Sequence, residues 1–124
     1  MTMTDNMERI LIIDDDANLR NVMGFSLQGV GYEVVLAADG REGVEKHRAQ
    51  PADLIVTDLY MPGQEGLETI QELRKDFPRV PIIAMSGAVL ANTMLTIAAN
   101  LGAVKVLHKP FDFDELLKAI EETL

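Results

Sequence analysis

Short apolar runs rich in β-branched residues alternate along this chain with segments of helical periodicity, and this alternation leaves few possible folds. We predict strands over residues 8–13, 33–37, 53–57, 82–85 and 104–107. We predict helices over residues 17–29, 40–49, 65–76, 89–101 and 113–124. Strict alternation of strands and helices implies a parallel sheet with helices on both faces. The expected fold class is therefore α/β, a (βα)5 doubly wound five-stranded parallel sheet with strand order 2-1-3-4-5.

Length and charge exclude several classes of protein. The 124 residues fit one domain, and there is no cysteine for a disulfide or a thiolate metal site. No apolar stretch is long enough to span a bilayer, so we predict a cytoplasmic protein without a membrane partner. A net charge of −9 disfavours binding to nucleic acid and favours divalent cations or a basic protein partner. We expect residues 1–7 to be a disordered or vector-derived leader and residues 8–124 to be the domain.

Two predicted helices carry long stripes of apolar side chains. The first helix carries its apolar and small side chains near one face: Leu19, Val22, Met23, Ser26, Leu27 and Val30. The fourth helix lies in a span without any charge, from Pro81 to Val104, and its stripe of Leu90, Met94, Ile97 and Leu101 is the expected core face. Such an uncharged helix fits either close packing on the sheet or a docking surface.

Polar residues of different kinds follow four of the predicted strands. Asp14, Asp15 and Asp16 follow the first, and Asp58 follows the third. Ser86 and Gly87 follow the fourth, and His108, Lys109 and Pro110 follow the fifth. In an open parallel α/β sheet, ligands bind beyond the carboxyl ends of the strands. We therefore expect carboxylates, a hydroxyl and an ammonium to converge on one rim.

The carboxylates at this rim indicate a hard cation. Neighbouring aspartates repel one another unless a cation lies among them. Oxygen ligands without His or Cys favour Mg²⁺. The alternative is that the acidic run only solvates a strand end and caps a helix, and we favour this capping role for Asp16 alone.

Asp58 has the chemistry of a phosphoryl acceptor. A carboxylate can attack a phosphoryl group to form an aspartyl phosphate, while a lysine and a hydroxyl hold the phosphoryl oxygens. Lys109 and Ser86 are placed for these roles. The Lys109-Pro110 peptide bond is a candidate for the cis geometry, because X-Pro bonds admit it at low cost.

These segments together resemble the receiver domain of two-component response regulators, which has the flavodoxin-like, CheY-like fold. The matching segments are ILIIDDDANLR, GYEVVLAADGREG, DLIVTDLYMPGQEG, PIIAMSG and GAVKVLHKPFD. The resemblance implies that Asp58 takes a phosphoryl group from a phosphohistidine. It implies Mg²⁺, for which Mn²⁺ can substitute, held by Asp14, Asp15, Asp58 and the backbone carbonyl of Tyr60. It further implies phosphoryl contacts from Ser86, Lys109 and backbone N–H groups at Leu59 and Gly87.

The resemblance also implies partners. A sensor histidine kinase or a histidine phosphotransfer protein would supply the phosphoryl group. An output domain or partner protein would bind the face formed by the fourth helix, fifth strand and fifth helix, and a weak homodimer is an open alternative. One residue departs from the family: Val106 stands where an aromatic residue is usual. We expect signalling to use the fourth helix and the loop before it instead.

Two other functions are alternatives for this sequence. A flavodoxin-like cofactor-binding domain needs a phosphate cradle after the first strand, and three aspartates there would repel a phosphate. A phosphohydrolase with an aspartate nucleophile needs a general acid close after the nucleophile, whereas Asp58 is followed by Leu59 and Tyr60. The phosphoacceptor domain is the favoured interpretation; it would act as a signalling switch rather than a metabolic enzyme.

Overall fold

We describe the protein from a computed structural model, over residues 7–59, 66–87 and 91–124, with the side chains of residues 91–95 set aside. Strands and helices alternate as predicted. The strands are β1 (Arg9–Ile13), β2 (Glu33–Ala37), β3 (Leu54–Asp58), β4 (Ile82–Ser86) and β5 (Lys105–His108). The helices are α1 (Ala17–Gly29), α2 (Gly40–Ala49), α3 (Gly66–Asp76), α4 (Ala91–Leu101) and α5 (Phe113–Thr123).

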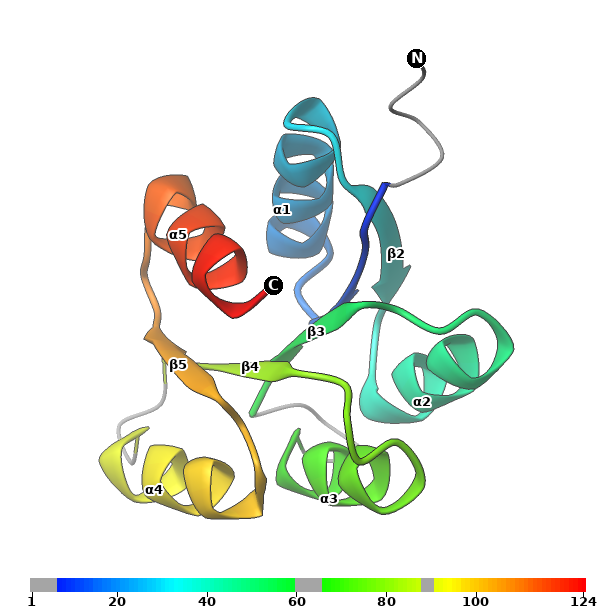
Figure 1. Ribbon diagram of the computed structural model, residues 1–124. Coiled ribbons are helices and arrows are strands. Elements are labelled where there is room, and N and C mark those ends of the chain that lie inside the picture. The colour runs from blue at the N-terminus through cyan, green and yellow to red at the C-terminus, as the bar shows by residue number, and fades with distance from the viewer. Residues whose placement is uncertain (1–6, 60–65, 88–90) are drawn as a thin grey trace.

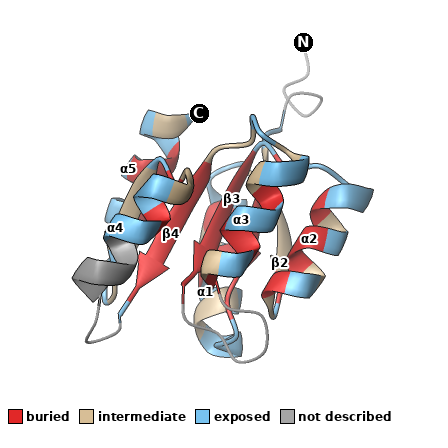
Figure 2. Cartoon of the chain, turned by 90° about the horizontal axis from the view of Figure 1, so that it is seen from below, coloured by how far each residue is buried: buried red, intermediate tan, exposed pale blue. Residues whose placement is uncertain are grey.

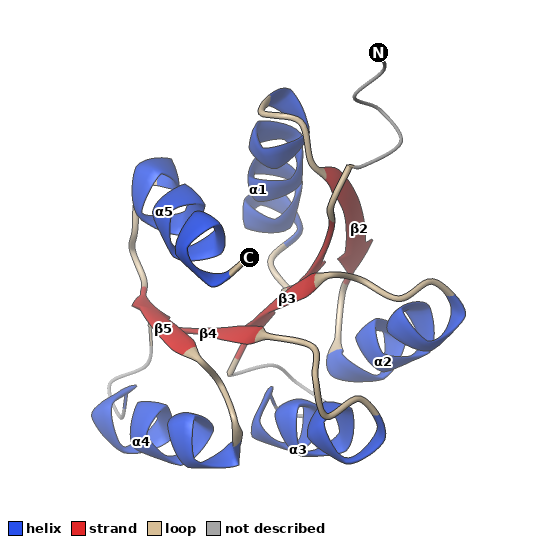
Figure 3. Cartoon of the chain, in the orientation of Figure 1, coloured by secondary structure: helices blue, strands red, loops and turns tan. Residues whose placement is uncertain are grey.

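The sheet is parallel throughout, and its strand order is β2-β1-β3-β4-β5, which confirms the predicted topology. Helices α1 and α5 cover one face of the sheet, and α2, α3 and α4 cover the other (Figures 1 and 3). The first and third strands are neighbours, so the order of connections reverses between them. A crevice at this switch point is where ligands bind in such sheets.

The central strands are apolar over most of their length because both of their faces are covered. Along β1, Leu11 and Ile13 belong to the core beneath α2, α3 and α4, while Ile10 and Ile12 belong to the core beneath α1 and α5. Every residue of β3 and β4 is buried, as the red central strands of Figure 2 show. The sheet is therefore a rigid support for whatever its strand ends carry.

An aspartate caps the N-terminus of three of the helices. Asp16 accepts a hydrogen bond from the Leu19 N–H at 3.1 Å, which confirms its predicted capping role in α1. Asp39 caps α2, and Asp112 forms a reciprocal capping box with Glu115 at the start of α5. Such caps satisfy backbone N–H groups that the first helical turn leaves unpaired. They also fix where each loop enters its helix.

The predicted apolar faces of α1 and α4 were partly wrong. In α1, Met23 and Leu27 pack against the sheet, but Val22 is 62% exposed and Val30 is exposed as well. In α4, Ala98 is buried and Leu101 packs on the core, whereas Ile97 is 41% exposed. Both helices bury a narrower stripe than their composition suggests, because the sheet covers only one side of each. Leu90 and Met94 lie outside the residues whose side chains are described.

Three strands run one residue further than predicted. Strand β3 includes Asp58, β4 includes Ser86 and β5 includes His108. Two of the predicted functional residues are thus held by the sheet itself rather than by loops. No helix among the described residues is long and apolar enough to cross a bilayer.

Candidate functional site

Three aspartates meet beyond the carboxyl ends of β1 and β3. Oxygen atoms of Asp14, Asp15 and Asp58 lie within 4.8 Å of one another. Asp14 is fully buried, Asp58 is 6% exposed, and Asp15 is exposed. The adjacency of β1 and β3 brings them together, since Ile13 lies opposite Thr57 in the register. Two nearly buried carboxylates so close together require a compensating positive charge.

Lys109 supplies that charge. Its Nζ donates to Asp14 Oδ2 at 2.9 Å and to Asp58 Oδ2 at 3.0 Å, so one ammonium bridges both carboxylates. Burial pulls the pKa of Lys109 down, but its hydrogen bonds and charge interactions with Asp14 and Asp58 prevail and raise the pKa above its ordinary value. The Lys109-Pro110 bond is cis, as suspected from the sequence.

Asp14 is held by groups that the sequence alone did not indicate. Its Oδ1 accepts from the Asp16 N–H at 2.9 Å, and its backbone carbonyl accepts from the Arg20 guanidinium at 2.7 Å. Arg20 is in α1, one turn beyond the acidic run, and could have been found only from helical spacing. These two contacts fix the loop after β1.

Ser86 leaves a polar atom unsatisfied. Among the described side chains, its Oγ is the one enclosed nitrogen or oxygen without a hydrogen-bond partner. Such a group is rare in a folded protein and calls for an explanation, such as an absent ion or ligand. The next residue, Gly87, packs so closely on Lys109 that an added Cβ would lie 3.0 Å from the Lys109 Cβ.

Leu59 and Gly66 pack against the backbone next to Asp58. Leu59 is buried and donates its N–H to the Met85 carbonyl at 2.9 Å, so this predicted phosphoryl contact is engaged within the sheet. Gly66 lies against the Asp58 carbonyl so closely that any side chain there would collide with backbone. This need for glycine did not emerge from the sequence, because it depends on how α3 approaches β3.

The family model of the response regulator receiver domain matches residues 10–121 of this chain. The chain belongs to the response regulator receiver domain family. It is 35% identical over 120 residues to the transcriptional regulatory protein ZraR of Escherichia coli (strain K12), covering 97% of this chain and 27% of ZraR. The chain thus spans about a quarter of the length of that relative.

Solved structures agree with the family. The receiver domain protein (CheY-like) from Methanospirillum hungatei JF-1 has a TM-score of 0.88 and 33% identity, over 95% of this chain and 94% of that one. The response regulator protein TrrA from Thermotoga maritima, solved in complex with Mg(2+)-BeF, has a TM-score of 0.85 and 34% identity. That likeness covers 95% of this chain and all of TrrA.

Four other residues complete the description of the rim and its surroundings. Val106 is half-buried in β5, next to the strand that carries Ser86. Tyr60 lies outside the described residues. His108 is exposed at the end of β5, and His47 is buried in α2, away from the rim.

Proposed function

We propose that this receiver accepts a phosphoryl group on Asp58 from a phosphohistidine of a sensor kinase or a histidine phosphotransfer protein. The observation that carries the proposal is the bridge from Lys109 to both Asp14 and Asp58. The bridge places the Lys109 ammonium and the Asp14 carboxylate beside Asp58, the carboxylate that we expect to react. The unsatisfied Ser86 Oγ close by supports a phosphoryl oxygen as its missing partner.

In the proposed transfer, one oxygen of the Asp58 carboxylate forms a bond to phosphorus. The phosphorus–nitrogen bond of the donor breaks, and its electron pair returns to the imidazole. Lys109 would then neutralise charge on the phosphoryl oxygens, and the Ser86 hydroxyl would donate to one of them. An open hollow of about 470 Å³ lies beside Lys109, lined by Leu19, Gly87, Pro110 and Phe111, and would let a donor approach.

The donor set suits a divalent cation. Asp14, Asp15 and Asp58 offer only oxygen, which matches the preference of Mg²⁺, and Mn²⁺ would find the same ligands. The Tyr60 carbonyl would complete the protein ligands. The bound ion would neutralise the charge of the incoming phosphoryl group. The ion pairs of Lys109 with Asp14 and Asp58 are consistent with a positive charge binding among these carboxylates.

The output step is proposed to involve α4. Val106 lacks the size and the polar tip of an aromatic residue, so it cannot report a movement of Ser86 as an aromatic side chain would. The link from Ser86 to the surface would instead follow the backbone from β4 into α4. An output domain or partner protein would bind the face formed by α4, β5 and α5.

A phosphorylation assay tests the proposal directly. Incubation with Mg²⁺ and acetyl phosphate should add one phosphoryl group, detected by intact mass. Asp58→Asn should abolish the adduct because it removes the nucleophile. If the unsubstituted protein stays unmodified under several donor and metal conditions, the proposed function is wrong.

Asp53→Asn is the matched control. Asp53 immediately precedes β3, at the opposite end of the same strand, where it accepts the Arg9 N–H at 2.7 Å. It carries the same charge and would undergo the same chemical change. The adduct should persist in this variant, since its amide oxygen can still accept that hydrogen bond.

A further inference from the structure

Arg20 contacts the backbone on both sides of Asp15. Its Nη1 donates to the Asp14 carbonyl at 2.7 Å, and the side chain is half-buried. Its backbone N–H donates to the Asp16 carbonyl at 2.9 Å, in the first turn of α1. A single residue of α1 thus holds the residues that flank one of the three clustered carboxylates.

The carbonyl that Arg20 holds belongs to the peptide bond between Asp14 and Asp15. Because a peptide bond is planar, fixing its oxygen also fixes the plane from which the Asp15 backbone continues. The other groups of Asp14 are engaged too. Its N–H donates to the Ala37 carbonyl at 3.1 Å, and its carboxylate oxygens accept from the Asp16 N–H and from Lys109. The direction of the exposed Asp15 side chain therefore depends on how its neighbours are held.

The charge of Arg20 has the wrong sign to attract a cation to this rim. A guanidinium beside clustered carboxylates reduces their attraction for a divalent ion, because like charges repel. If Arg20 acted only through its charge, its removal would strengthen cation binding. If it acts by holding the Asp14 carbonyl, its removal would weaken cation binding. The two roles predict effects of opposite sign.

From these contacts we propose that Arg20 is a positioning residue for the cation site, which orients the Asp15 carboxylate through the Asp14 carbonyl. The inference rests on the proposed function, in which Asp14, Asp15 and Asp58 bind Mg²⁺. Without the guanidinium, the Asp14–Asp15 peptide would lose the group that fixes its plane, and the buried Asp14 carbonyl would lose a hydrogen bond. The exposed Asp15 side chain would then sample orientations outside the cluster, and this freedom would be lost again on binding the cation.

Mg²⁺ titration of Arg20→Met tests the role. Methionine keeps a long unbranched side chain but removes the charge and every donor. The dissociation constant is measured from amide shifts of residues 14–16 in the unphosphorylated protein, so the readout does not depend on phosphoryl transfer. We expect it to rise by about 10-fold, as for other groups that orient metal ligands. An unchanged or smaller dissociation constant would overturn the role of Arg20.

Arg20→Lys separates positioning from a general loss of stability. Lysine keeps the positive charge and a donor for the Asp14 carbonyl, so this variant should recover part of the Mg²⁺ affinity lost in Arg20→Met. Melting temperatures without added metal report the stability of both variants separately. If the lysine and methionine variants bind Mg²⁺ equally weakly, the donated hydrogen bond does not position the site and the inference is wrong.

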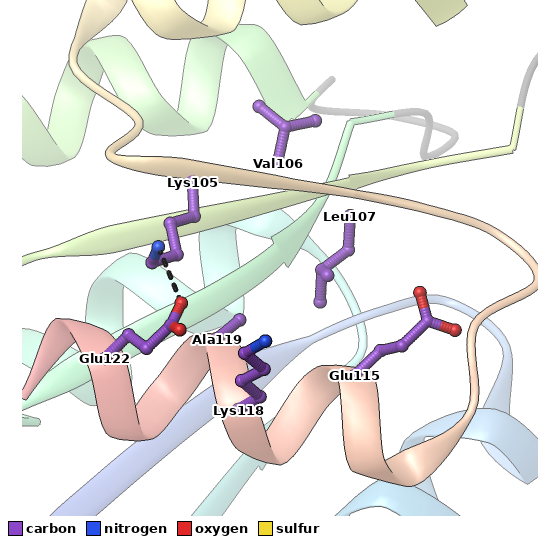
Figure 4. A pocket seen from close by; sticks show the side chains of 7 residues that line it. All are labelled: Lys105, Val106, Leu107, Glu115, Lys118, Ala119 and Glu122. Atoms are coloured by element: carbon purple, nitrogen blue, oxygen red, sulfur yellow. Dashed lines mark hydrogen bonds and ion pairs between the residues drawn. The ribbon is translucent and has the colours of Figure 1, made fainter.

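Lys105→Met is the matched control. Lys105 begins β5, at the end of the sheet opposite the rim, and its Nζ donates to Glu122 at 3.1 Å (Figure 4). This variant also removes one positive charge and one hydrogen bond, yet its Mg²⁺ dissociation constant should stay unchanged. A rise equal to that of Arg20→Met would contradict a local role. If the unsubstituted protein binds no Mg²⁺, the cation site and the role of Arg20 are both wrong; if it binds Mg²⁺ and Arg20→Met binds equally well, only the role of Arg20 is wrong.

Discussion

His47 is a residue whose role follows from its surroundings rather than from the sequence. It is 3% exposed, its Nδ1 accepts the Ala52 N–H at 3.0 Å, and its ring meets Phe77 edge-on at 4.5 Å. Burial, and then the neighbouring Arg48, lower its pKa below the ordinary value. The neutral ring thus fastens the end of α2 to the start of β3.

This lowered pKa predicts a pH-dependent stability. The folded protein holds the proton on His47 less tightly than the unfolded chain does. The stabilising contribution is therefore complete above the unfolded pKa, about 6.5, and is lost as the pH falls toward the lower folded pKa. We expect the free energy of unfolding in urea to decrease between about pH 7.5 and 5.5.

Two histidine variants test whether His47 causes this pH dependence of the free energy of unfolding. His47→Gln should remove most of the decrease, because glutamine does not titrate. His108→Gln should retain it, since His108 is exposed at the end of β5. An unchanged slope in His47→Gln would mean that other groups cause it.

At the scale of elements, the alternation of strands and helices was readable from sequence because its signals are local. Apolar runs, capping aspartates and the glycines that end helices each act within a few residues. The strand ends then placed Asp58, Ser86 and Lys109 on one rim. The sequence could not predict how the elements pack against one another. Examples are the exposure of Val22 and Ile97, and the hydrogen bond from the Leu59 N–H to the Met85 carbonyl. Another is the close backbone contact that leaves no room for a side chain at Gly66.

The element that should respond most to phosphorylation is α4. Because Val106 stands where an aromatic residue is usual, we propose that movement of Ser86 reaches the surface mainly along the backbone from β4 toward α4. A beryllofluoride mimic with Mg²⁺ should therefore shift amides across Ala91–Leu101 more than those of α2. Shifts confined to the rim residues, with α4 unmoved, would show that the signal takes another route.

At the scale of the whole molecule, the net charge of −9 and the acidic rim make two different predictions for added cations. Any salt screens the general repulsion among surface acids and should raise the melting temperature slightly. A cation that binds only the folded state stabilises it further, by RT ln(1 + [L]/Kd). Mg²⁺ should therefore raise the melting temperature more than Na⁺ at the same ionic strength.

Asp15→Asn separates these two effects. The side chain is exposed, so its replacement should leave the fold intact while removing one of the three clustered carboxylates. The excess stabilisation by Mg²⁺ should be largely lost, and the general salt effect should remain. Asp53→Asn, which also removes one negative charge but at the other end of β3, should keep the excess. Equal responses to Mg²⁺ and Na⁺ in the unsubstituted protein would mean that the rim holds no specific cation, and that Lys109 alone balances Asp14 and Asp58.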